Sequence, residues 1–418
     1  MTGWFVLVES NTTGSGRLFC AAATQLGLRP VLLARDPGRY PYVAADRIEH
    51  RVVDTGDPDA VLAACERLGG TVAGVVSSSE YYVGTAGEVA RSLGLPHPDP
   101  DAVRACRDKS AQRALLRAAG LPSPAFAAAA TADEAVEAAA AIGLPVVVKP
   151  VAGSGSIGVR RCASLPEVRE AASYVLRTDP AELALPPQPA VLVEEYLDGA
   201  EHSVETLDDQ VIGVTRKHLG QEPHFVETGH DFPAPLPPAD RVALAETALA
   251  ALRALGLGWG AAHVELRHAP GGPPRVIEVN PRLAGGMIPR VVQEATGIDM
   301  IRHLVASAAG RPEPLRPTWH QAASIRFLLA TADGRLTEIA GVADARRVPG
   351  VVEVGLIREA GHDIVLRQSF QDRLGYVIAS AQDGAAAARA AEDGLRMLRA
   401  WITPCRTDID FVTEGSPS

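Results

Sequence analysis

Two kinds of hydrophobic pattern alternate along the first hundred residues. Short apolar runs predict buried strands, and the segments between them carry apolar residues at the three- and four-residue spacing of amphipathic helices. Strands that alternate with helices in this way predict a parallel sheet covered on both faces. The expected strands are 4–10, 30–35 and 72–78, and the expected helices are 16–28, 59–69 and 86–95.

The pattern changes after a proline-rich linker at Pro96, Pro98 and Pro100. One long helix is expected over 101–120, and from residue 203 the chain becomes rich in strand patterns, with a loop near 217–238. Four segments follow from these changes: 1–105, 106–204, 205–320 and 321–418. The first is α/β and the others are α+β. Further predictions are strands at 144–151, 159–163, 190–197, 261–266, 275–280, 324–331, 350–357 and 374–381, and helices at 131–143, 166–176, 239–256 and 384–402.

Composition and charge narrow the function classes. The chain is 47% hydrophobic and 22% charged, which is typical of a soluble globular enzyme. A net charge of −10 argues against a nucleic-acid partner, because phosphate binding needs a basic face. The sequence holds no apolar run long enough to span a membrane and no signal-peptide pattern at its start, so a cytoplasmic protein is expected. The five scattered cysteines form no CxxC pair and predict core thiols rather than disulfides or a zinc site.

Polar residues interrupt two neighbouring strand patterns. Side chains alternate faces along a strand, so Glu265 on 261–266 and Glu278 and Asn280 on 275–280 would meet if the two strands pair across the Pro-Gly-Gly-Pro turn. Facing carboxylates repel unless a cation lies between them, and two carboxylates with an amide oxygen suit Mg²⁺. Arg282 just beyond the strand, with Arg267, indicates an anionic ligand. The alternative is an exposed strand with solvated charges.

A glycine-rich segment, Gly153-Ser-Gly155-Ser-Ile-Gly158, spells the letters of a dinucleotide-binding turn. Such a turn leads into a helix, whereas here a strand pattern follows. We therefore expect a hairpin loop whose backbone N–H groups face phosphates, with Lys149 adding a point charge. A second glycine pattern at 12–16 lacks its last glycine and is better explained as a tight turn. The strand exit at Glu194 to Leu197 fits an adenine site, with Glu201 reaching a ribose, about as well as a surface turn.

The order of these features resembles the ATP-grasp superfamily, in its carboxylate–amine ligase branch. The matching stretches are RDKSAQRALLRAAGLPSP, PVVVKP, the glycine loop, VEEYLDGAEHSVE, HVEL and EVNPR. The resemblance implies a Rossmann-like pre-ATP-grasp domain at 1–105, a lid subdomain at 106–204, a central subdomain at 205–320 and a small C-terminal domain at 321–418.

The resemblance also implies roles for individual residues. Arg282 would contact the transferred phosphoryl group and the substrate carboxylate, and Glu265, Glu278 and Asn280 would hold two Mg²⁺ ions, with Mn²⁺ as an alternative. The ATP-binding residues would be Lys109 and Lys149 (phosphates), Gly153, Ser154, Gly155, Ser156 and Gly158 (covering loop), Glu194, Glu195 and Leu197 (adenine) and Glu201 (ribose).

Within the superfamily, FVETGHDFPA at 225–234 is similar to the substrate loop of the bacterial L-amino acid ligases of the bacilysin type, which make dipeptides. This similarity implies that Glu227 holds a substrate ammonium group and that His230 acts beside the acyl group, with Glu80 facing the same cavity. Those ligases carry a bulky aromatic residue where this chain has Gly286, next to Gly285, so a roomier substrate pocket is expected.

The implied reaction joins a small-molecule carboxylate to an amine in two steps, through an acyl phosphate made from ATP. Positioning and charge neutralisation carry such chemistry, which agrees with the absence of a Ser–His–Asp or Cys–His pattern. Two alternatives stay open: transfer of the acyl or carboxy phosphate to a thiol or biotin-type acceptor, and a regulatory protein that binds ATP without turnover. A homodimer is a family-level expectation.

Overall fold

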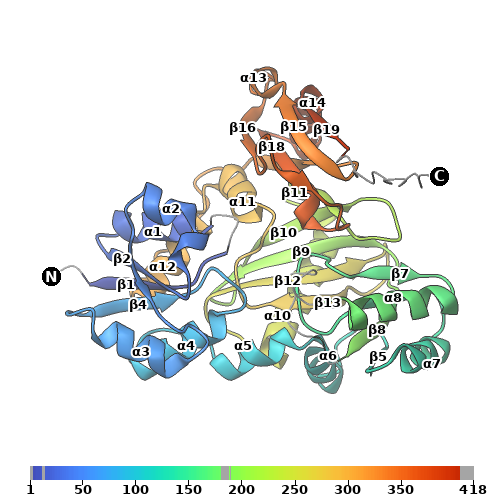
Figure 1. Cartoon of the computed structure of the whole chain (residues 1–418), viewed down its shortest axis with the longest axis horizontal. Helices are drawn as coiled ribbons and strands as arrows, with labels where there is room; N and C mark the ends of the chain where they lie inside the picture. The colour runs from blue at the N-terminus through green and yellow to red at the C-terminus, as the bar shows by residue number, and fades with distance from the viewer. Residues whose placement is uncertain (1–2, 12–14, 180–187, 189, 405–418) are drawn as a thin grey trace, which may run out of the picture.

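The computed structural model describes residues 3–11, 15–179, 188 and 190–404. The glycine pattern at 12–16 and the proline-rich stretch around 180–189 lie largely outside them, as does Cys405. The first segment forms a four-stranded parallel sheet in the order β3-β2-β1-β4, with helices on both faces (Figure 1), as the alternating pattern predicts. Its elements are β1 (Trp4–Val8), α1 (Ser15–Gln25), β2 (Arg29–Ala34), α2 (Pro41–Ala45), β3 (Glu49–Val52), α3 (Pro58–Glu66), β4 (Val72–Val76) and α4 (Val83–Ser92).

A second, antiparallel sheet, which we call the lid sheet, has the order β5-β8-β6-β7. The glycine-rich segment connects β6 to β7, which pair in antiparallel fashion as expected for a hairpin. Helices α7 and α8 pack together and against this sheet, and Thr131 caps α7 by accepting from the backbone N–H of Glu134. The elements are β5 (Phe126–Ala129), α7 (Ala132–Ile142), β6 (Val146–Pro150), β7 (Arg160–Cys162), α8 (Leu165–Arg177) and β8 (Val191–Glu195).

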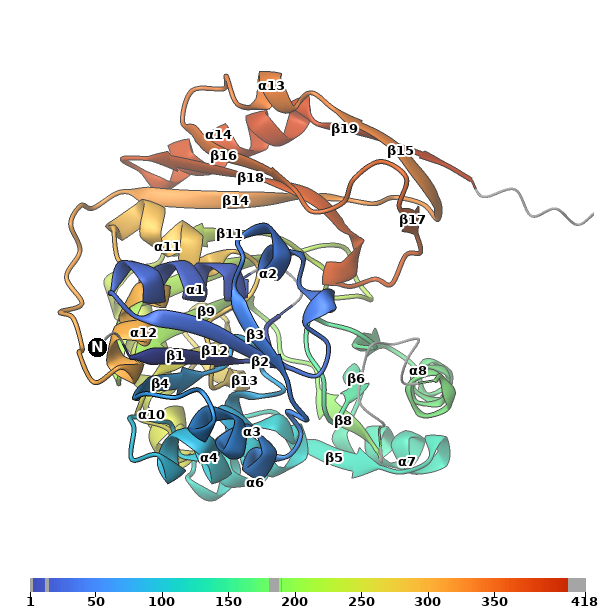
Figure 2. The ribbon, with the colours of Figure 1, turned by 60° about the vertical axis from the view of Figure 1, so that its left-hand side comes forward.

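An eight-stranded sheet runs through the middle of the molecule and into its C-terminal part (Figure 2). Its order is β13-β12-β9-β10-β11-β14-β18-β16, so the tail of the chain adds its strands to the sheet that the central segment begins. The predicted boundary between residues 204 and 205 falls inside β9. The strands are β9 (Ala200–Leu207), β10 (Gln210–Leu219), β11 (Glu227–Phe232), β12 (Ala261–His268), β13 (Arg275–Asn280), β14 (Ala322–Leu329), β16 (Val351–Leu356) and β18 (Arg373–Ala381).

The two faces of strands β9, β10, β12 and β13 differ in chemistry. One face carries Val204, Val214, Val264 and Leu266, which pack with Leu244 and its neighbours on α10 (Pro238–Ala254) into one apolar cluster. The residues between them along the strands are charged or polar and point to the opposite face. Strand alternation therefore places a row of charged side chains on the face away from α10.

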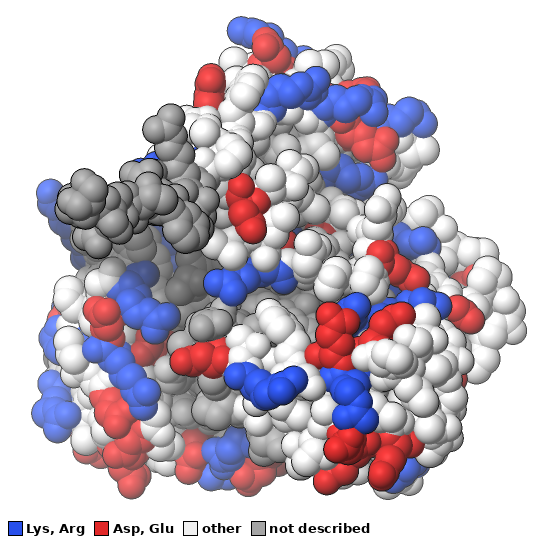
Figure 3. All heavy atoms as spheres, turned by 45° about the vertical axis from the view of Figure 1, so that its right-hand side comes forward, with Lys and Arg blue, Asp and Glu red and all other residues white. Residues whose placement is uncertain are grey.

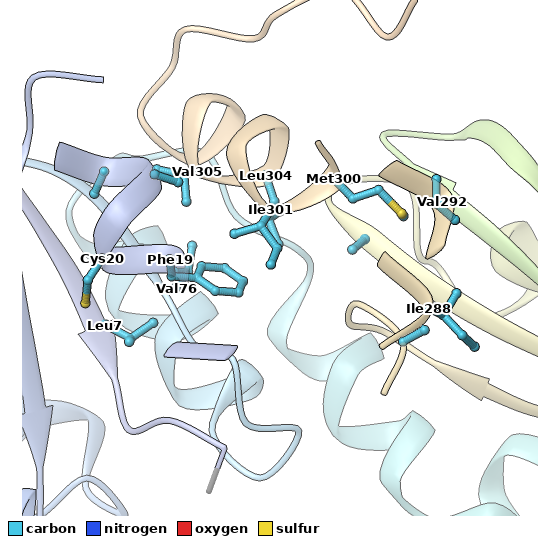
Figure 4. Packing of buried hydrophobic residues seen from close by; sticks show 14 of the residues in the cluster. Leu7, Phe19, Cys20, Val76, Ile288, Val292, Met300, Ile301, Leu304 and Val305 are labelled. Atoms are coloured by element: carbon cyan, nitrogen blue, oxygen red, sulfur yellow. The ribbon is translucent and has the colours of Figure 1, made fainter. Parts of the chain in front are cut away.

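The N-terminal sheet is joined to the centre by a large apolar core. Helices α11 (Ile288–Thr296) and α12 (Met300–Ala308) pack between the two, and α12 contacts both α1 and β4. Figure 4 shows Phe19 beside Ile301 in this core. The remaining elements are α5 (Pro100–Arg107), α6 (Lys109–Ala118), β15 (Gly334–Ala340), α13 (Val342–Ala345), β17 (Asp363–Ile364), α14 (Gly384–Met397) and β19 (Arg399–Thr403), with 3-10 turns at Pro37–Arg39 and Phe370–Asp372.

Three predicted elements are wrong in their extent. The expected helix 101–120 is broken at Asp108, whose side chain accepts from the N–H groups of Ser110 and Ala111 and starts a new helix. The expected loop near 217–238 contains the end of β10 and all of β11. The expected helix 384–402 ends at Met397, because residues 399–403 pair with β15 as strand β19.

Surface charge is mixed. Basic and acidic side chains are interspersed on the face shown in Figure 3. Within the described ranges, no helix is long and apolar enough to cross a membrane. The four cysteines in these ranges are buried free thiols, and burial raises the pKa of Cys20 and Cys106 to about 12.

Candidate active site

One cavity lies between the lid sheet and the charged face of the eight-stranded sheet. It encloses about 960 Å³ of space that is partly open to solvent. A smaller cavity beside it is lined by Glu80, Lys109 and Arg282 among others. Gly158, His230, Gly285 and Gly286 line neither. Of the residues predicted from the sequence, the main cavity brings together Lys109, Lys149, Gly153, Ser154, Gly155, Ser156, Glu194, Glu195, Leu197, Glu201, Glu227, Glu265, Glu278, Asn280 and Arg282.

The predicted strand pair is confirmed, since β12 and β13 are antiparallel and Glu265 lies directly opposite Glu278. Each carboxylate is neutralised by an ammonium group. The Lys217 Nζ lies 2.8 Å from Glu265, and the Lys109 Nζ lies 3.1 Å from Glu278. Behind Glu265, the His263 ring bridges to Glu205, with ring nitrogens 3.1 Å and 2.9 Å from the two carboxylates.

Charges in this cluster set one another's pKa values. Burial works against protonated His263, but Glu205 and Glu265 outweigh it and raise the pKa of His263 to about 9. Burial also opposes the charge of Lys217, yet three surrounding carboxylates raise its pKa well above the usual value. Glu265 has a lowered pKa because Lys217 and His263 outweigh its burial. These shifts favour the charged forms of His263, Lys217 and Glu265 at neutral pH.

The chemistry of Glu265, Glu278 and Asn280 fits Mg²⁺. Two carboxylates and an amide supply hard oxygen ligands, and Mg²⁺ commonly takes few protein ligands and completes its shell with water and phosphate. No group of three His, Cys, Asp or Glu residues that would hold a metal occurs within the described ranges. A site here would therefore depend on Asn280 and on phosphate oxygens, and the two lysine ammonium groups now supply the compensating positive charge.

The glycine loop is folded down over the cavity. The Lys109 Nζ donates to the Gly153 carbonyl oxygen at 2.7 Å, which ties the loop to the start of α6. Gly153, Gly155 and Gly158 all have positive φ, a conformation that glycine adopts most readily. A Cβ on Gly155 would lie 2.2 Å from the Phe370 ring, so this loop also touches the C-terminal part of the chain.

Lys149 and Glu194 form a buried charge cluster with Arg113. Glu194 lies 2.6 Å from both the Lys149 Nζ and the Arg113 Nε, and Arg113 is fully buried. Arg113 also donates to the Ile277 carbonyl oxygen. Burial favours neutral Glu194, but Arg113 and Lys149 outweigh it and lower its pKa. Burial lowers the pKa of Lys149, an effect that Glu194 only partly offsets.

Of the residues predicted to contact the adenine base or the ribose, Glu195 and Glu201 have carboxylates that basic side chains bind. The Glu195 carboxylate is held bidentately by Arg275, at 2.7 Å for each oxygen, so only the rest of this residue is free to contact a base. Leu197 is buried at the cavity wall. Glu201 faces the cavity but is shared between Lys217 at 2.9 Å and Arg267 at 3.3 Å.

Glu227 and His230 lie on strand β11, not on a loop as expected. An irregularity in the pairing of β10 with β11 sets Leu219 opposite Glu227 but His218 opposite Gly229, so Thr228 is an extra residue. A β-bulge of this kind re-aims side chains. It turns Glu227 to the same face as His230 and Lys217. Both Glu227 oxygens are bound, Oε1 by Lys217 and Oε2 by Arg373, each at 2.8 Å.

The expected open space over Gly286 is absent. A Cβ built on Gly286 would lie 2.6 Å from His230 Nε2 and 3.5 Å from Arg373 Nη1, so these two side chains fill the space. Gly286 also has a φ of +58°. Gly285, in contrast, faces open space. The expectation of a roomier pocket at Gly286 is therefore wrong.

His230 is completely buried, and burial lowers its pKa to about 3. It packs edge-on against Phe327, and neither of its ring nitrogens has a hydrogen-bond partner. Its Nε2 lies 3.6 Å from Glu227, outside hydrogen-bond distance. His230 is thus a neutral side chain with unused hydrogen-bonding capacity.

Arg282 and Glu80 meet across the boundary between the N-terminal sheet and the central segment. The Arg282 Nε and Nη2 donate to the same Glu80 oxygen, at 3.0 Å and 2.6 Å. Burial disfavours the charged forms of both Arg282 and Glu80. Even so, Glu80 raises the pKa of Arg282, while Arg282, with Lys109 and Arg107, lowers that of Glu80. Glu80 lines the smaller cavity and not the main cavity that Glu227 lines, so it does not face the same cavity as Glu227 as expected.

Several charged residues of the site were missed in the sequence. Lys217 sits in a basic stretch, RKH, that resembles many surface strands. Arg113 lies on a helix with an ordinary amphipathic pattern, and Arg373 lies in the tail, far along the chain from Glu227. For His263, the alternation with Glu265 along one strand was a usable signal. The missed residues are Arg113, Glu205, Lys217, His263 and Arg373.

These features form a candidate site for a nucleotide and its phosphates, and comparison with known proteins gives the class of protein. The family described as ATP-grasp domain matches residues 142–290, and the family described as L-amino acid ligase C-terminal domain 2 matches residues 326–402. The crystal structure of an L-amino acid ligase from Bacillus licheniformis is similar in fold, with a TM-score of 0.78 and 22% identity, covering 96% of this chain and 99% of that one.

Two relatives are similar in sequence. A Sinorhizobium fredii protein described as uncharacterized protein y4rH is 42% identical over 378 residues, which are 90% of this chain and 78% of that protein. Carnosine synthase 1 of Gallus gallus is 30% identical over 361 residues, and the chain spans only 38% of that longer protein. The chain belongs to the ATP-grasp superfamily, in the branch of ATP-dependent ligases that form carbon–nitrogen bonds.

Proposed function

We propose that this protein joins the carboxylate of an amino-acid-like substrate to an amine, through an acyl phosphate, and so forms an amide or peptide bond in small-molecule biosynthesis. The observation that carries the proposal is the single cavity that the glycine loop, the Glu265–Glu278 pair, Glu227 and Arg282 share. Phosphate-facing groups and groups suited to an amino acid thus lie in one space.

Each group in the cavity has a role in this proposal. Lys109, Lys149 and the backbone N–H groups of the glycine loop bind the phosphates, and the loop excludes water from the acyl phosphate. Arg282 neutralises the oxygens of the transferred phosphoryl group and orients the substrate carboxylate. Glu227 takes the substrate ammonium group. Neutral His230, which lines neither cavity, lies 3.6 Å from Glu227 and packs beside that carboxylate.

Two Mg²⁺ ions held by Glu265, Glu278 and Asn280 would neutralise phosphate charge, with Mn²⁺ as an alternative. When metal and ATP bind, Lys109 and Lys217 no longer need to neutralise these carboxylates. Both ammonium groups are then free to turn toward phosphate oxygens.

The similarity to proteins named for joining amino acids supports the substrate class. The L-amino acid ligase of the solved structure and a D-alanine–D-alanine ligase of Marinobacter nauticus, 29% identical over 260 residues, are amino-acid ligases by name, and the Gallus gallus relative is named a carnosine synthase. A cytoplasmic, homodimeric enzyme remains the expectation, and size-exclusion chromatography with light scattering tests the dimer.

Hydroxamate formation tests the function. The protein is incubated with ATP, Mg²⁺, hydroxylamine and individual L-amino acids, and hydroxamate and ADP are measured. We expect amino-acid-dependent formation of both, at least about 100-fold lower in Glu278→Gln and unchanged in Glu246→Gln, an exposed control on α10. ATP binding with no turnover for any acid would contradict the proposal and favour a regulatory protein.

A further inference from the structure

A buried arginine of the C-terminal part reaches the substrate end of the site. Arg373, the first residue of β18, is only 6% exposed. Its Nη2 donates to Glu227 Oε2 at 2.8 Å and lies 3.4 Å from the Glu227 carbonyl oxygen. The carbon of the guanidinium lies 3.7 Å from the centre of the Phe327 ring on β14, in a cation–π contact. Arg373 thus joins the C-terminal strands to Glu227.

The segment before Arg373 is rigid for a local reason. Ser369 and Asp372 form a capping box around the short turn Phe370–Asp372, and the Asp372 backbone carbonyl oxygen accepts from the N–H of Ala330 on the neighbouring chain segment. The Arg373 side chain then passes over Phe327 toward Gly286, where a Cβ would lie 3.5 Å from Nη1. Phe327, Gly286 and the turn together leave the guanidinium little freedom to move.

The other oxygen of Glu227 shows what the site accepts. Glu227 and Lys217 both line the cavity, and the Lys217 Nζ binds Glu227 Oε1 at 2.8 Å. A lysine ammonium is chemically the same group as the primary ammonium of an amino acid. Lys217 has a further carboxylate partner outside the metal-binding set, Glu201 at 2.9 Å, so it keeps a counter-charge when another ammonium group takes its place at Oε1.

We propose that Arg373 is a positioning residue: it fixes Glu227 through Oε2 and so holds Oε1 in place for the primary ammonium group of a substrate. The inference rests on the proposed function and adds the C-terminal part of the chain to substrate recognition. The planar guanidinium is held over Phe327, so its one hydrogen bond to Oε2 has a fixed direction, whereas a lysine at this position would act as a point charge.

The substitution Arg373→Gln tests the proposal by steady-state kinetics. The probes are the L-amino acid with the highest hydroxamate yield, the same acid without its amino group, and an amino acid amide as the acceptor. We expect the KM of the partner that carries the recognised ammonium group to rise about tenfold or more, with kcat within about threefold of wild type. The KM of the acid without its amino group should stay unchanged.

The same experiment separates the two sources of the ammonium group. A higher KM for the amino acid in the hydroxamate assay assigns Oε1 to the activated substrate. A higher KM only for the amino acid amide assigns it to the attacking amine. Either result supports the positioning role. An equal rise for the acid that lacks an amino group, or a loss of kcat with no change in any KM, overturns it.

A double-mutant cycle distinguishes positioning of Glu227 by Arg373 from a general structural effect of the substitution. If Arg373 acts through Glu227, Arg373→Gln should change KM by less than about twofold in a Glu227→Gln background, and Arg373→Lys should recover part of the loss. Full additivity in the cycle overturns the proposal. Arg290→Gln is the control, because Arg290 also bonds to the C-terminal part, at Glu353, but does not contact Glu227.

A crystal structure of Arg373→Gln gives a readout that needs no turnover. We expect the Glu227 carboxylate to rotate away from its place beside Lys217. A carboxylate that keeps its position overturns the inference, even if the wild-type protein forms no hydroxamate. Absence of hydroxamate in the wild type, in contrast, counts against the proposed function alone.

Discussion

Replacement of Gly286 by alanine tests the packing at the substrate end of the site. Gly286 has a φ of +58°, where a residue with a Cβ loses about 1–2 kcal/mol. The new Cβ would lie 2.6 Å from His230 Nε2, and overpacking of a closed interior costs about 1–3 kcal/mol. We expect Gly286→Ala to lower the free energy of unfolding by about 2–5 kcal/mol, measured by urea unfolding.

The neighbouring glycine is a matched control. A Cβ on Gly285 meets no atom within 4 Å, and Gly285 is not among the residues with positive φ, so Gly285→Ala should stay within about 0.5 kcal/mol of wild type. Displacement of His230 should also reduce hydroxamate formation in Gly286→Ala only. Equal stability of the two variants would refute the reasoning, because it would mean that His230 and Arg373 do not enclose Gly286.

Three further predictions follow from buried contacts. Phe370→Ala removes the aromatic ring that Gly155 contacts and should raise the KM for ATP about fivefold. Phe370→Leu should stay close to wild type in the same ATP titration. An unchanged KM for ATP in Phe370→Ala would show that this contact has no part in closing the glycine loop over the cavity. His230 has a pKa near 3 in the folded protein and about 6.5 in the unfolded chain, so it favours unfolding as the pH falls below 6.5. Wild type should therefore lose about 1.6 kcal/mol more stability than His230→Gln between pH 6.5 and pH 5 in urea unfolding, and parallel pH profiles would contradict this. Arg113→Met removes one of the two buried partners of Glu194, while Lys149 remains, and should cost about 3 kcal/mol. The exposed Arg117→Met should cost under about 0.5 kcal/mol, and similar losses for both would mean that the buried Arg113–Glu194 pair adds nothing.

Local signals in the sequence were sufficient for much of the site. Alternation on two strands and a Pro-Gly-Gly-Pro turn placed Glu265 opposite Glu278, and glycines between two strand patterns predicted the hairpin loop that connects β6 to β7. These features depend on neighbouring residues alone. Backbone geometry and side-chain alternation therefore determine them without knowledge of the rest of the fold.

Contacts between distant segments were not predictable in the same way. Arg373 and Glu227 are separated by 146 residues, and nothing near either residue records their pairing. The orientation of Glu227 depends on one extra residue, Thr228, which the strand pattern hides. The space over Gly286 was misjudged because its occupants, His230 and Arg373, come from two other strands. Such errors arise wherever tertiary packing decides a side chain's surroundings.

The continuity of the eight-stranded sheet has a consequence for how this protein can be divided. Strand β11, which carries Glu227 and His230, is hydrogen-bonded on its far side to β14 of the C-terminal part. A chain ended at residue 320 would leave β11 as an open edge, with its backbone groups unpaired and prone to aggregate. The last quarter of the chain is therefore not a detachable appendage, and exchange of C-terminal parts between relatives should alter substrate choice together with solubility.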